Sequence, residues 1–202
     1  MNPAEVALQL VAPIYEASLW PEVLNQLARA VEGSTTVFVV HSLSGSPSGN
    51  VSVGINIDPS LQNEYDAYYH GVNVHVSKFP AKLSPGVIAL SHEYLPDHEL
   101  QQSEYYNDFL RRLGVFHLIG AVIAQEAGLV SAYSTLRPRQ AGPFGDEAAQ
   151  VFRFLLPHFQ RAAKLQNKQA RCTPGSNRWT FFRLDSHSPF GRLLSQPFDL
   201  VF

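Results

Sequence analysis

Hydrophobic residues recur with a helical period over residues 3–32 and then alternate with polar residues in two later segments. The helical period predicts two amino-terminal helices joined near Leu19 and Trp20. Residues 35–43 and 50–57 are rich in Val, Ile and Thr, and this composition predicts two antiparallel strands. The chain therefore opens with helices and continues with a strand pair.

A further helix is expected to begin after Asp58, whose side chain can cap it, with Tyr65 and Tyr69 four residues apart on one face. The pattern then weakens. The elements expected next are an irregular segment (71–85), a short strand (86–90) and a polar connection (91–100).

Residues 103–114 combine a helix start, an aromatic face and a glycine stop. Ser103 can accept hydrogen bonds from the free backbone N–H groups of the first turn. Gly114 supplies the permissive backbone at which many helices end. Aromatic and aliphatic residues recur at helical spacing between them, so one stripe is expected to pack on the following strand.

The carboxyl-terminal half predicts a hairpin and a long helix. Two apolar segments, 115–125 and 129–136, flank a compact turn that ends in Gly128. From Asp146 to about Lys168 the apolar residues recur with a helical period. This order predicts an α+β fold in which an antiparallel sheet of about five strands is flanked by helices, a GAF-like or PAS-like arrangement.

Composition indicates one globular domain without a global attraction to nucleic acid. The 202 residues are 45% hydrophobic and 16% charged, which suits one well-buried domain. The formal charge of -2 does not favour phosphate, and late basic residues are expected to form a solvated helix face. Direct DNA binding by this chain is therefore not expected. The late basic residues are Arg153, Arg161, Lys164, Lys168 and Arg171.

The number of cysteines and the length of the apolar segments indicate in which cellular compartment the protein is expected. Cys172 is the single cysteine, so no intrachain disulfide is possible. The longest apolar stretch, near 115–124, is far shorter than the roughly 20 residues that cross a bilayer, and no export signal precedes it. A cytoplasmic protein without a membrane partner is expected.

Dispersed motifs resemble one protein family. The Ser-Glu-Tyr-Tyr-Asn-Asp-Phe-Leu-Arg run at 103–111 resembles a Ser-Glu-Phe-Tyr-Asn-Asp-Phe-Leu-Arg motif in the amino-terminal sensor-like domain of many bacterial LuxR-type transcriptional regulators. Gly-Pro-Phe at 142–144 and Leu-Leu-Pro-His-Phe at 155–159 are similar to two further signatures of that family. An Asn-Val pair at 73–74 stands where Asp-Pro is common there. The resemblance spans roughly residues 6–169.

The resemblance implies a sensor domain and a separate tail. Residues 1–169 are expected to form a PAS/GAF-like sensor domain. In such regulators a carboxyl-terminal helix-turn-helix reads DNA, and the preceding domain is taken to regulate it. Residues 170–202 contain Pro and Gly that would interrupt such a module, so an irregular tail is expected there.

Aromatic residues of two predicted helices, with one histidine, are candidates for a pocket between helices and sheet. His117 interrupts an otherwise apolar strand and needs a hydrogen-bond partner if it is buried. Tyrosine and histidine would add polar groups to an apolar wall, which suits a small organic ligand. The alternative is that the rings only fill the core. The candidate ligand-binding residues are Tyr65, Tyr69, Tyr105, Tyr106, Phe109 and His117.

The sequence offers little support for metal or cofactor chemistry. His70 and His75, and the polar stretch 92–99, contain metal-binding residue types without the spacing of a known site. No P-loop, dinucleotide fingerprint or zinc-hydrolase motif occurs. Neither a metal, a cofactor nor an enzymatic activity is therefore expected.

Three hypotheses follow for function. The first is a regulatory domain that binds an unidentified small organic molecule and signals through the helix after Asp146. The second is a ligand-free homodimerisation scaffold, in which Phe152, Leu155 and Phe159 form an intersubunit helix bundle. The third is an enzyme on a GAF-like fold, for which no catalytic group is identifiable.

Overall fold

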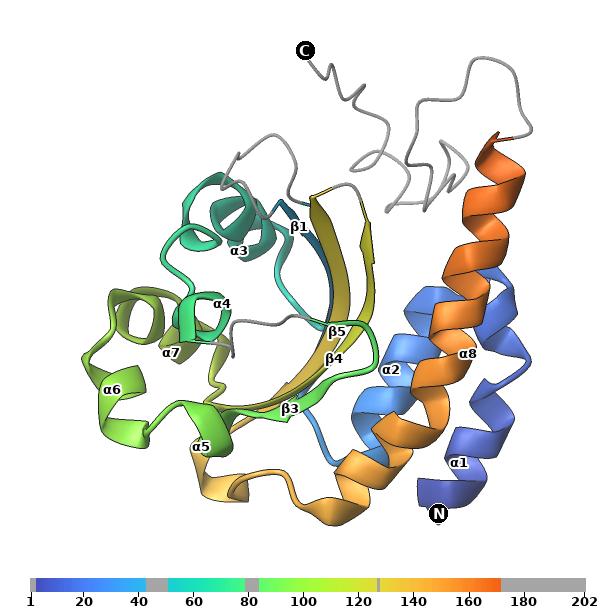
Figure 1. Ribbon diagram of the computed structural model, residues 1–202. Helices are drawn as coiled ribbons and strands as arrows, with labels where there is room; N and C mark the ends of the chain where they lie inside the picture. The colour runs from blue at the N-terminus through green and yellow to red at the C-terminus, as the bar shows by residue number, and fades with distance from the viewer. Residues whose placement is uncertain (1–2, 43–50, 79–83, 127, 172–202) are drawn as a thin grey trace.

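One antiparallel sheet forms the centre of the molecule. The computed structural model describes residues 3–42, 51–78, 84–126 and 128–171. Its five strands lie in the order β2-β1-β5-β4-β3, which confirms the predicted α+β class (Figure 1). The GAF-like or PAS-like assignment stays a prediction. The strands are β1 (Thr35–Ser42), β2 (Val51–Ile55), β3 (Ile88–Leu90), β4 (His117–Glu126) and β5 (Leu129–Arg137).

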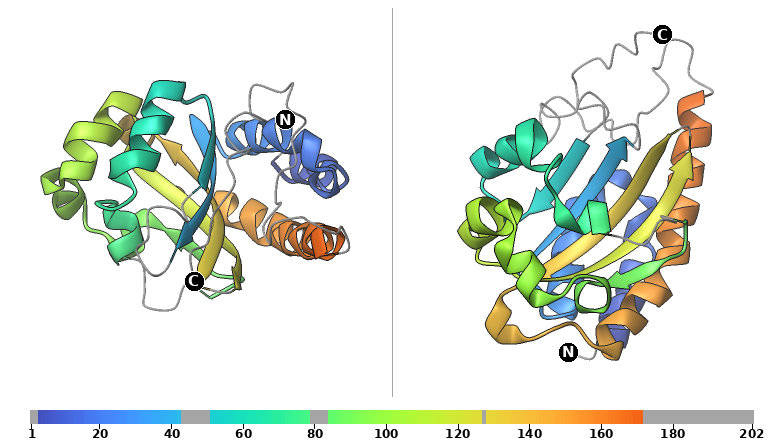
Figure 2. Two further views of the ribbon diagram at one scale, coloured as in Figure 1. Left: turned by 90° about the horizontal axis from the view of Figure 1, so that it is seen from above. Right: turned by 60° about the vertical axis from the view of Figure 1, so that its left-hand side comes forward.

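Helices cover both faces of this sheet and give three layers, which are clearest in the left view of Figure 2. One face carries α1 (Pro3–Leu10), η1 (Pro13–Tyr15), η2 (Ala17–Leu19), α2 (Trp20–Ala30) and α8 (Asp146–Arg171). The other carries α3 (Pro59–Glu64), η4 (Tyr65–Tyr69), α4 (Val74–Lys78), α5 (Ser91–Tyr94), α6 (Asp97–Gln102), η5 (Tyr105–Leu110) and α7 (Arg111–Leu113). A short turn, η6 (Arg139–Ala141), follows β5.

The face beneath α2 and α8 is densely packed with aromatic rings. Trp20 lies edge-on to Phe38 of β1 and to Phe159 of α8, with ring centroids 5.3 and 5.4 Å apart. Tyr133 of β5 stacks on Phe152 at 4.9 Å. Edge-to-face and offset-stacked pairs add to the burial of large apolar surface, so this layer anchors the sheet.

Trp20 also ties the entry of α2 to the preceding turn. Its indole Nε1–H donates to the carbonyl oxygen of Ile14 at 2.8 Å inside the core. We expect Trp20→Phe to lower the free energy of unfolding by about 1–2 kcal/mol, because the substitution removes this buried donor and leaves a small void. Urea denaturation measures the change. An unchanged unfolding midpoint would show that this hydrogen bond contributes nothing net.

The bend before α8 gives a structural role to the Gly-Pro-Phe motif. Buried Arg137 donates from Nε to the carbonyl oxygen of Gly142 at 2.9 Å, and its guanidinium lies 4.2 Å from the centroid of the Phe144 ring. Gly142 has a φ of 72°, in the region that glycine adopts without strain. The motif therefore fixes the path of the chain from β5 into α8.

The residues proposed for an intersubunit helix bundle are buried inside the chain. Phe152, Leu155 and Phe159 have no exposed surface and belong to the core between α8 and the sheet. The sheet of the same chain covers this apolar helix face in the structure, and homodimerisation stays a prediction. The large apolar side chains that α8 exposes are Phe154 (41%) and Leu165 (48%).

Other sequence predictions have mixed outcomes. The hairpin of β4 and β5 and the long helix α8 are confirmed. The capping role of Ser103 is also confirmed, since its Oγ accepts from the backbone N–H of Tyr106 at 3.1 Å. Gly114 has a φ of 69° at the end of α7, as a glycine stop requires. The prediction of an irregular segment and a polar connection was wrong, because α4, α5 and α6 lie there.

Some predictions concern residues outside the described part of the chain. These are the loop around 43–50, Cys172 and the tail from 172 onward. Of the late basic residues, Arg153, Arg161 and Lys164 are exposed on α8. Within the described ranges, none of the helices is both long and apolar enough to span a membrane.

Candidate functional site

A cavity of 490 Å³ lies between the sheet and the helices opposite α8. This volume falls within the range of small-molecule binding sites. Two segments, which we call the first cover segment (59–78) and the second cover segment (91–113), lie over this face of the sheet (Figure 1). Residues of both segments line the cavity together with residues of β1, β4 and β5. The lining residues are Thr35, Val37, Val39, Ile57, Gln62, Tyr65, His70, Gly71, Asn73, His75, Val76, Tyr94, Tyr105, Phe109, Leu110, Leu113, Leu118, Gly120, Ala121, Val122, Val130, Ala132, Ser134 and Leu136.

Small residues at the centre of the sheet leave room for this cavity. Alternate residues of a strand share one face, so Gly120 on β4 and Ala132 and Ser134 on β5 lie on the cavity side. Gly120 is paired with Ser134, and Ala132 with Val122. A Cβ added to Gly120 would lie 2.9 Å from Ser134 Oγ. The strand pairing therefore places small residues next to one another on the sheet face that the cover segments pack over. Bulky residues at these positions would fill the space of the cavity.

Three of the six candidate residues line the cavity together. Tyr65 of η4 and Tyr105 and Phe109 of η5 are buried, and all three are lining residues. The Phe109 centroid lies 5.5 Å from the centroids of both tyrosine rings. Rings from the two helices thus form an aromatic wall over the sheet.

The other three candidates lie elsewhere. Tyr69 stacks on the Phe109 ring at 4.9 Å but is not a lining residue. Tyr106 packs edge-on against Phe116, away from the cavity. His117 is buried beside Phe116 and is not a lining residue of the cavity, and burial lowers its pKa.

The sequence reasoning missed a polar cluster around His75 of α4. His75 is 5% exposed, lines the cavity, and has Nδ1 3.1 Å from the hydroxyl oxygen of Tyr94. Its Nε2 is buried without a hydrogen-bond partner among the described residues. Burial lowers the pKa of His75 to about 4, so the imidazole is neutral at neutral pH.

Asn73 holds this cluster in place. Its side-chain oxygen accepts from the backbone N–H of His75 at 2.9 Å, and its Nδ2 donates to the Tyr65 hydroxyl at 3.0 Å. Asn73 therefore caps the short helix α4 and connects it to the aromatic wall. The signal in the sequence was the group of His70, Asn73 and His75, which was considered only for metal binding.

The ionisable side chains among the described lining residues of the cavity are tyrosines and histidines. None of its lining residues is Asp, Glu, Lys or Arg. Burial raises the pKa of Tyr65, Tyr94 and Tyr105 above the ordinary tyrosine value, so all three hydroxyls are protonated at neutral pH. The wall is thus largely apolar, with a few hydrogen-bonding groups.

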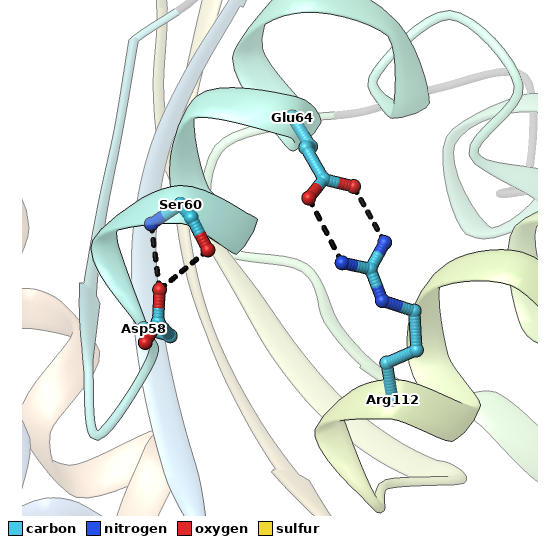
Figure 3. Close-up of polar contacts among 4 residues, drawn as sticks. All are labelled: Asp58, Ser60, Glu64 and Arg112. Carbon is cyan, nitrogen blue, oxygen red and sulfur yellow. Dashed lines mark hydrogen bonds and ion pairs between the residues drawn. The ribbon is translucent and has the colours of Figure 1, made fainter.

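Polar contacts on the outside join the two cover segments. Glu64 of α3 and Arg112 of α7 form a two-pronged ion pair, with Arg112 Nη2 2.8 Å from Glu64 Oε1 (Figure 3). The Tyr68 hydroxyl donates to Glu104 at 2.7 Å. Figure 3 also shows how α3 begins, where Asp58 Oδ1 accepts from the backbone N–H of Ser60 at 2.7 Å. The Glu64–Arg112 and Tyr68–Glu104 contacts hold the two cover segments together at the surface.

The ion pair between Glu64 and Arg112 gives a prediction about the cover. We expect Arg112→Ala to make backbone amides of η5 exchange with solvent roughly twofold to fivefold faster, because an exposed ion pair contributes modestly to local stability. Hydrogen–deuterium exchange with mass spectrometry measures this. The matched control is Arg111→Ala, which alters an exposed neighbour outside the pair. Equal exchange in both variants would contradict the prediction.

The polar stretch 92–99 does not assemble a metal site in the structure. The described residues contain no group of three or more His, Cys, Asp or Glu side chains placed to hold a metal ion. Glu99 instead pairs with Lys78 at 2.7 Å across the two cover segments. Its charge therefore has a surface partner.

The fold and the cavity together define an α+β domain with a ligand-sized chamber between sheet and helices. Among solved structures, the LBD domain of VqsR from Pseudomonas aeruginosa matches with a TM-score of 0.59 and 14% identity, over 80% of this chain and 93% of that chain. The N-acylhomoserine lactone dependent LuxR family transcription factor CepR2 from Burkholderia cenocepacia matches with a TM-score of 0.48 and 14% identity, over 78% and 93%. Escherichia coli SdiA matches with 0.49 and 13%, over 79% and 65%.

These matches are similarities of fold at low sequence identity. The likeness to the VqsR domain extends over most of both chains. No protein-family model matches the chain, and no curated protein matches it. The VqsR LBD domain therefore shares the overall fold of this chain.

Proposed function

We propose that this chain is a regulatory domain that senses a small organic molecule in the cavity between the sheet and the cover segments. The observation that carries the proposal is the cavity itself, which is 490 Å³ in volume and largely apolar. A well-packed interior has few voids larger than a water molecule, so a chamber of this size costs packing energy unless something fills it. A bound molecule would recover that energy.

Two further observations support this function. The buried Nε2 of His75, a residue that lines the cavity, has no hydrogen-bond partner among the described residues. The fold is also like that of the VqsR LBD domain. The motif at 103–111 adds the resemblance to LuxR-type sensor domains, and its residues Tyr105 and Phe109 belong to the cavity wall.

Mass spectrometry of the purified protein under native and then denaturing conditions tests the proposal. We expect a mass excess that disappears on denaturation, together with a released small molecule that can be identified. If the protein carries no such molecule, a library of neutral fragments is added, and amide NMR signals of the cavity residues are followed. A bare mass together with unchanged signals would contradict ligand sensing.

Signalling through α8 is a second part of the proposal. α8 packs on β4 and on α1, on the sheet face opposite the cavity, so a ligand would act on it through the sheet. We expect binding to change hydrogen exchange in α8. Unchanged exchange in α8 with a saturating ligand would contradict transmission along this route while leaving ligand binding intact.

Homodimerisation is a separate candidate role for α8. The observation that favours it is the exposure of Phe154 and Leu165 on the outer side of this helix. Sedimentation of the wild-type chain and of a Phe154→Ser, Leu165→Ser double variant tests it. A dimer that the double substitution dissociates would support this role, and a monomer at every concentration would exclude it.

A further inference from the structure

We propose that His75 anchors the ligand of this cavity through a hydrogen bond donated by its Nε2–H group. The ligand is then an uncharged, largely apolar molecule that carries a hydrogen-bond acceptor such as a carbonyl oxygen. This inference rests on the proposed function, since it specifies the ligand chemistry of the same cavity.

The position of His75 indicates a binding role. It comes from the first cover segment, and its hydroxyl partner Tyr94 comes from the second. A buried polar atom without a partner is uncommon in folded proteins, and its desolvation opposes folding. Nε2 of His75 is such an atom among the described residues, in a side chain that lines the cavity. A ligand atom at hydrogen-bonding distance would remove that cost.

The hydrogen bond to Tyr94 decides which polar group Nε2 requires. A phenol is a better donor than a neutral imidazole N–H, and an imidazole nitrogen is a better acceptor than a phenol oxygen. The Tyr94 hydroxyl is therefore assigned as donor to Nδ1, and the imidazole proton then lies on Nε2. An Nε2–H group requires an acceptor, so the ligand carries an oxygen with a free lone pair at this place.

Tyr105 adds a second polar group nearby. Its ring lies edge-on to the His75 ring, with centroids 6.2 Å apart, and its side chain also lines the cavity. The structure gives its hydroxyl no hydrogen bond within the described residues, and a phenol can donate or accept. The Tyr105 hydroxyl is therefore a second group in the cavity wall that can hydrogen-bond to a polar atom of the ligand.

The charge of the wall decides the charge of the ligand. A buried ion needs an opposite charge or several strong hydrogen bonds, because moving it out of water is costly. The lining residues that the structure describes include no Asp, Glu, Lys or Arg that would compensate a carboxylate or an ammonium group. The small residues Gly120 and Ala132, which line the cavity on the sheet side, instead suit the uncharged apolar part of a ligand.

A matched set of probes tests this inference. Acetophenone has a carbonyl oxygen on an apolar body, ethylbenzene has nearly the same shape without it, and benzoate and benzylammonium carry a negative and a positive charge. Dissociation constants come from NMR titration of amide signals around the cavity. Nitrogen NMR of the His75 ring reports the tautomer and any new hydrogen bond directly.

Substitutions of His75 separate its hydrogen bond from its bulk. We expect His75→Phe to weaken acetophenone binding about tenfold relative to ethylbenzene binding, because only acetophenone uses the donor. Glutamine carries an N–H donor at a similar distance from the backbone, so the acetophenone affinity of His75→Gln should lie within about threefold of the wild-type affinity. His98→Phe, at an exposed position on α6, is the matched control and should change neither affinity.

The outcomes distinguish this inference from the proposed function. Weaker acetophenone binding in His75→Phe with unchanged ethylbenzene binding, and weak or absent binding of both ions, would support the inference. The inference would be overturned if His75→Phe lost affinity for acetophenone and for ethylbenzene equally. It would also be overturned if benzoate or benzylammonium bound in the cavity as tightly as acetophenone, or if acetophenone did not bind to the wild-type protein. In each of those cases a different molecule released from the purified protein would still support ligand sensing.

Discussion

Ala132→Phe is expected to abolish ligand binding while leaving the protein folded. Ala132 lies on the cavity face of β5, paired with Val39 of β1 and Val122 of β4. A phenyl ring at this position would project into the space that a ligand needs. Phenylalanine is also favoured in strands, so the sheet should tolerate it. We expect at least about a hundredfold loss of acetophenone affinity, because ring and ligand compete for one volume.

The measurement pairs NMR titration with thermal unfolding. The melting temperature of Ala132→Phe should be equal to or above that of the wild-type protein, since the ring fills a void. Ala67→Phe adds the same ring at an exposed position on η4 and serves as the control. If Ala132→Phe bound acetophenone with wild-type affinity, the cavity between sheet and cover would not be the binding site.

The second large effect is a loss of stability in mild acid that depends on His75. Burial lowers the pKa of His75 from 6.5 to about 4 in the folded protein. Between these pH values the unfolded chain binds a proton that the folded chain does not. The free energy of unfolding therefore decreases as the pH falls through this window, by up to about 3 kcal/mol for this group. Below about pH 4 both states are protonated and this contribution stops changing.

Urea denaturation of the wild-type protein and His75→Gln measures this contribution. Glutamine does not titrate, so the variant should lose about 2–3 kcal/mol less than the wild type between pH 7 and roughly pH 4.5. The carboxylates are the same in both proteins and cancel in the comparison. His98→Gln removes an exposed imidazole and should keep the wild-type dependence. Equal pH dependence of wild type and His75→Gln would contradict a buried neutral His75.

Elements with strong local signals could be predicted from sequence. Asp58 caps α3 and Gly114 ends α7, as their side-chain chemistry and backbone freedom require. The hairpin of β4 and β5 follows from two apolar segments around a glycine turn. The three short helices α4, α5 and α6 could not be found in this way. Helices of four to six residues are unstable alone and exist here because tertiary packing supports them.

Some of the aromatic residues that the sequence singled out lie in the cavity wall and others do not. Helical spacing identified the aromatic stripe with Tyr105 and Phe109, but it could not tell Tyr105 from its neighbour Tyr106. One ring borders the cavity and the other packs on Phe116. The choice depends on how the helix is rotated against the sheet, which distant contacts decide. The partner of His75 lies 19 residues away, at Tyr94, and no periodicity connects them.

The sequence by itself determined the α+β class, the hairpins, the main helix boundaries and an aromatic stripe. These features depend on the hydrophobic period, on capping residues and on turn residues that lie close together in the chain. The tertiary structure alone decided that the apolar face of α8 is covered by the chain's own sheet and that a cavity lies on the opposite face. That cavity exists because strand register places Gly120 beside Ser134, and cover segments from two parts of the chain close over them. Such a juxtaposition arises from packing over long sequence separations, and local patterns do not encode it.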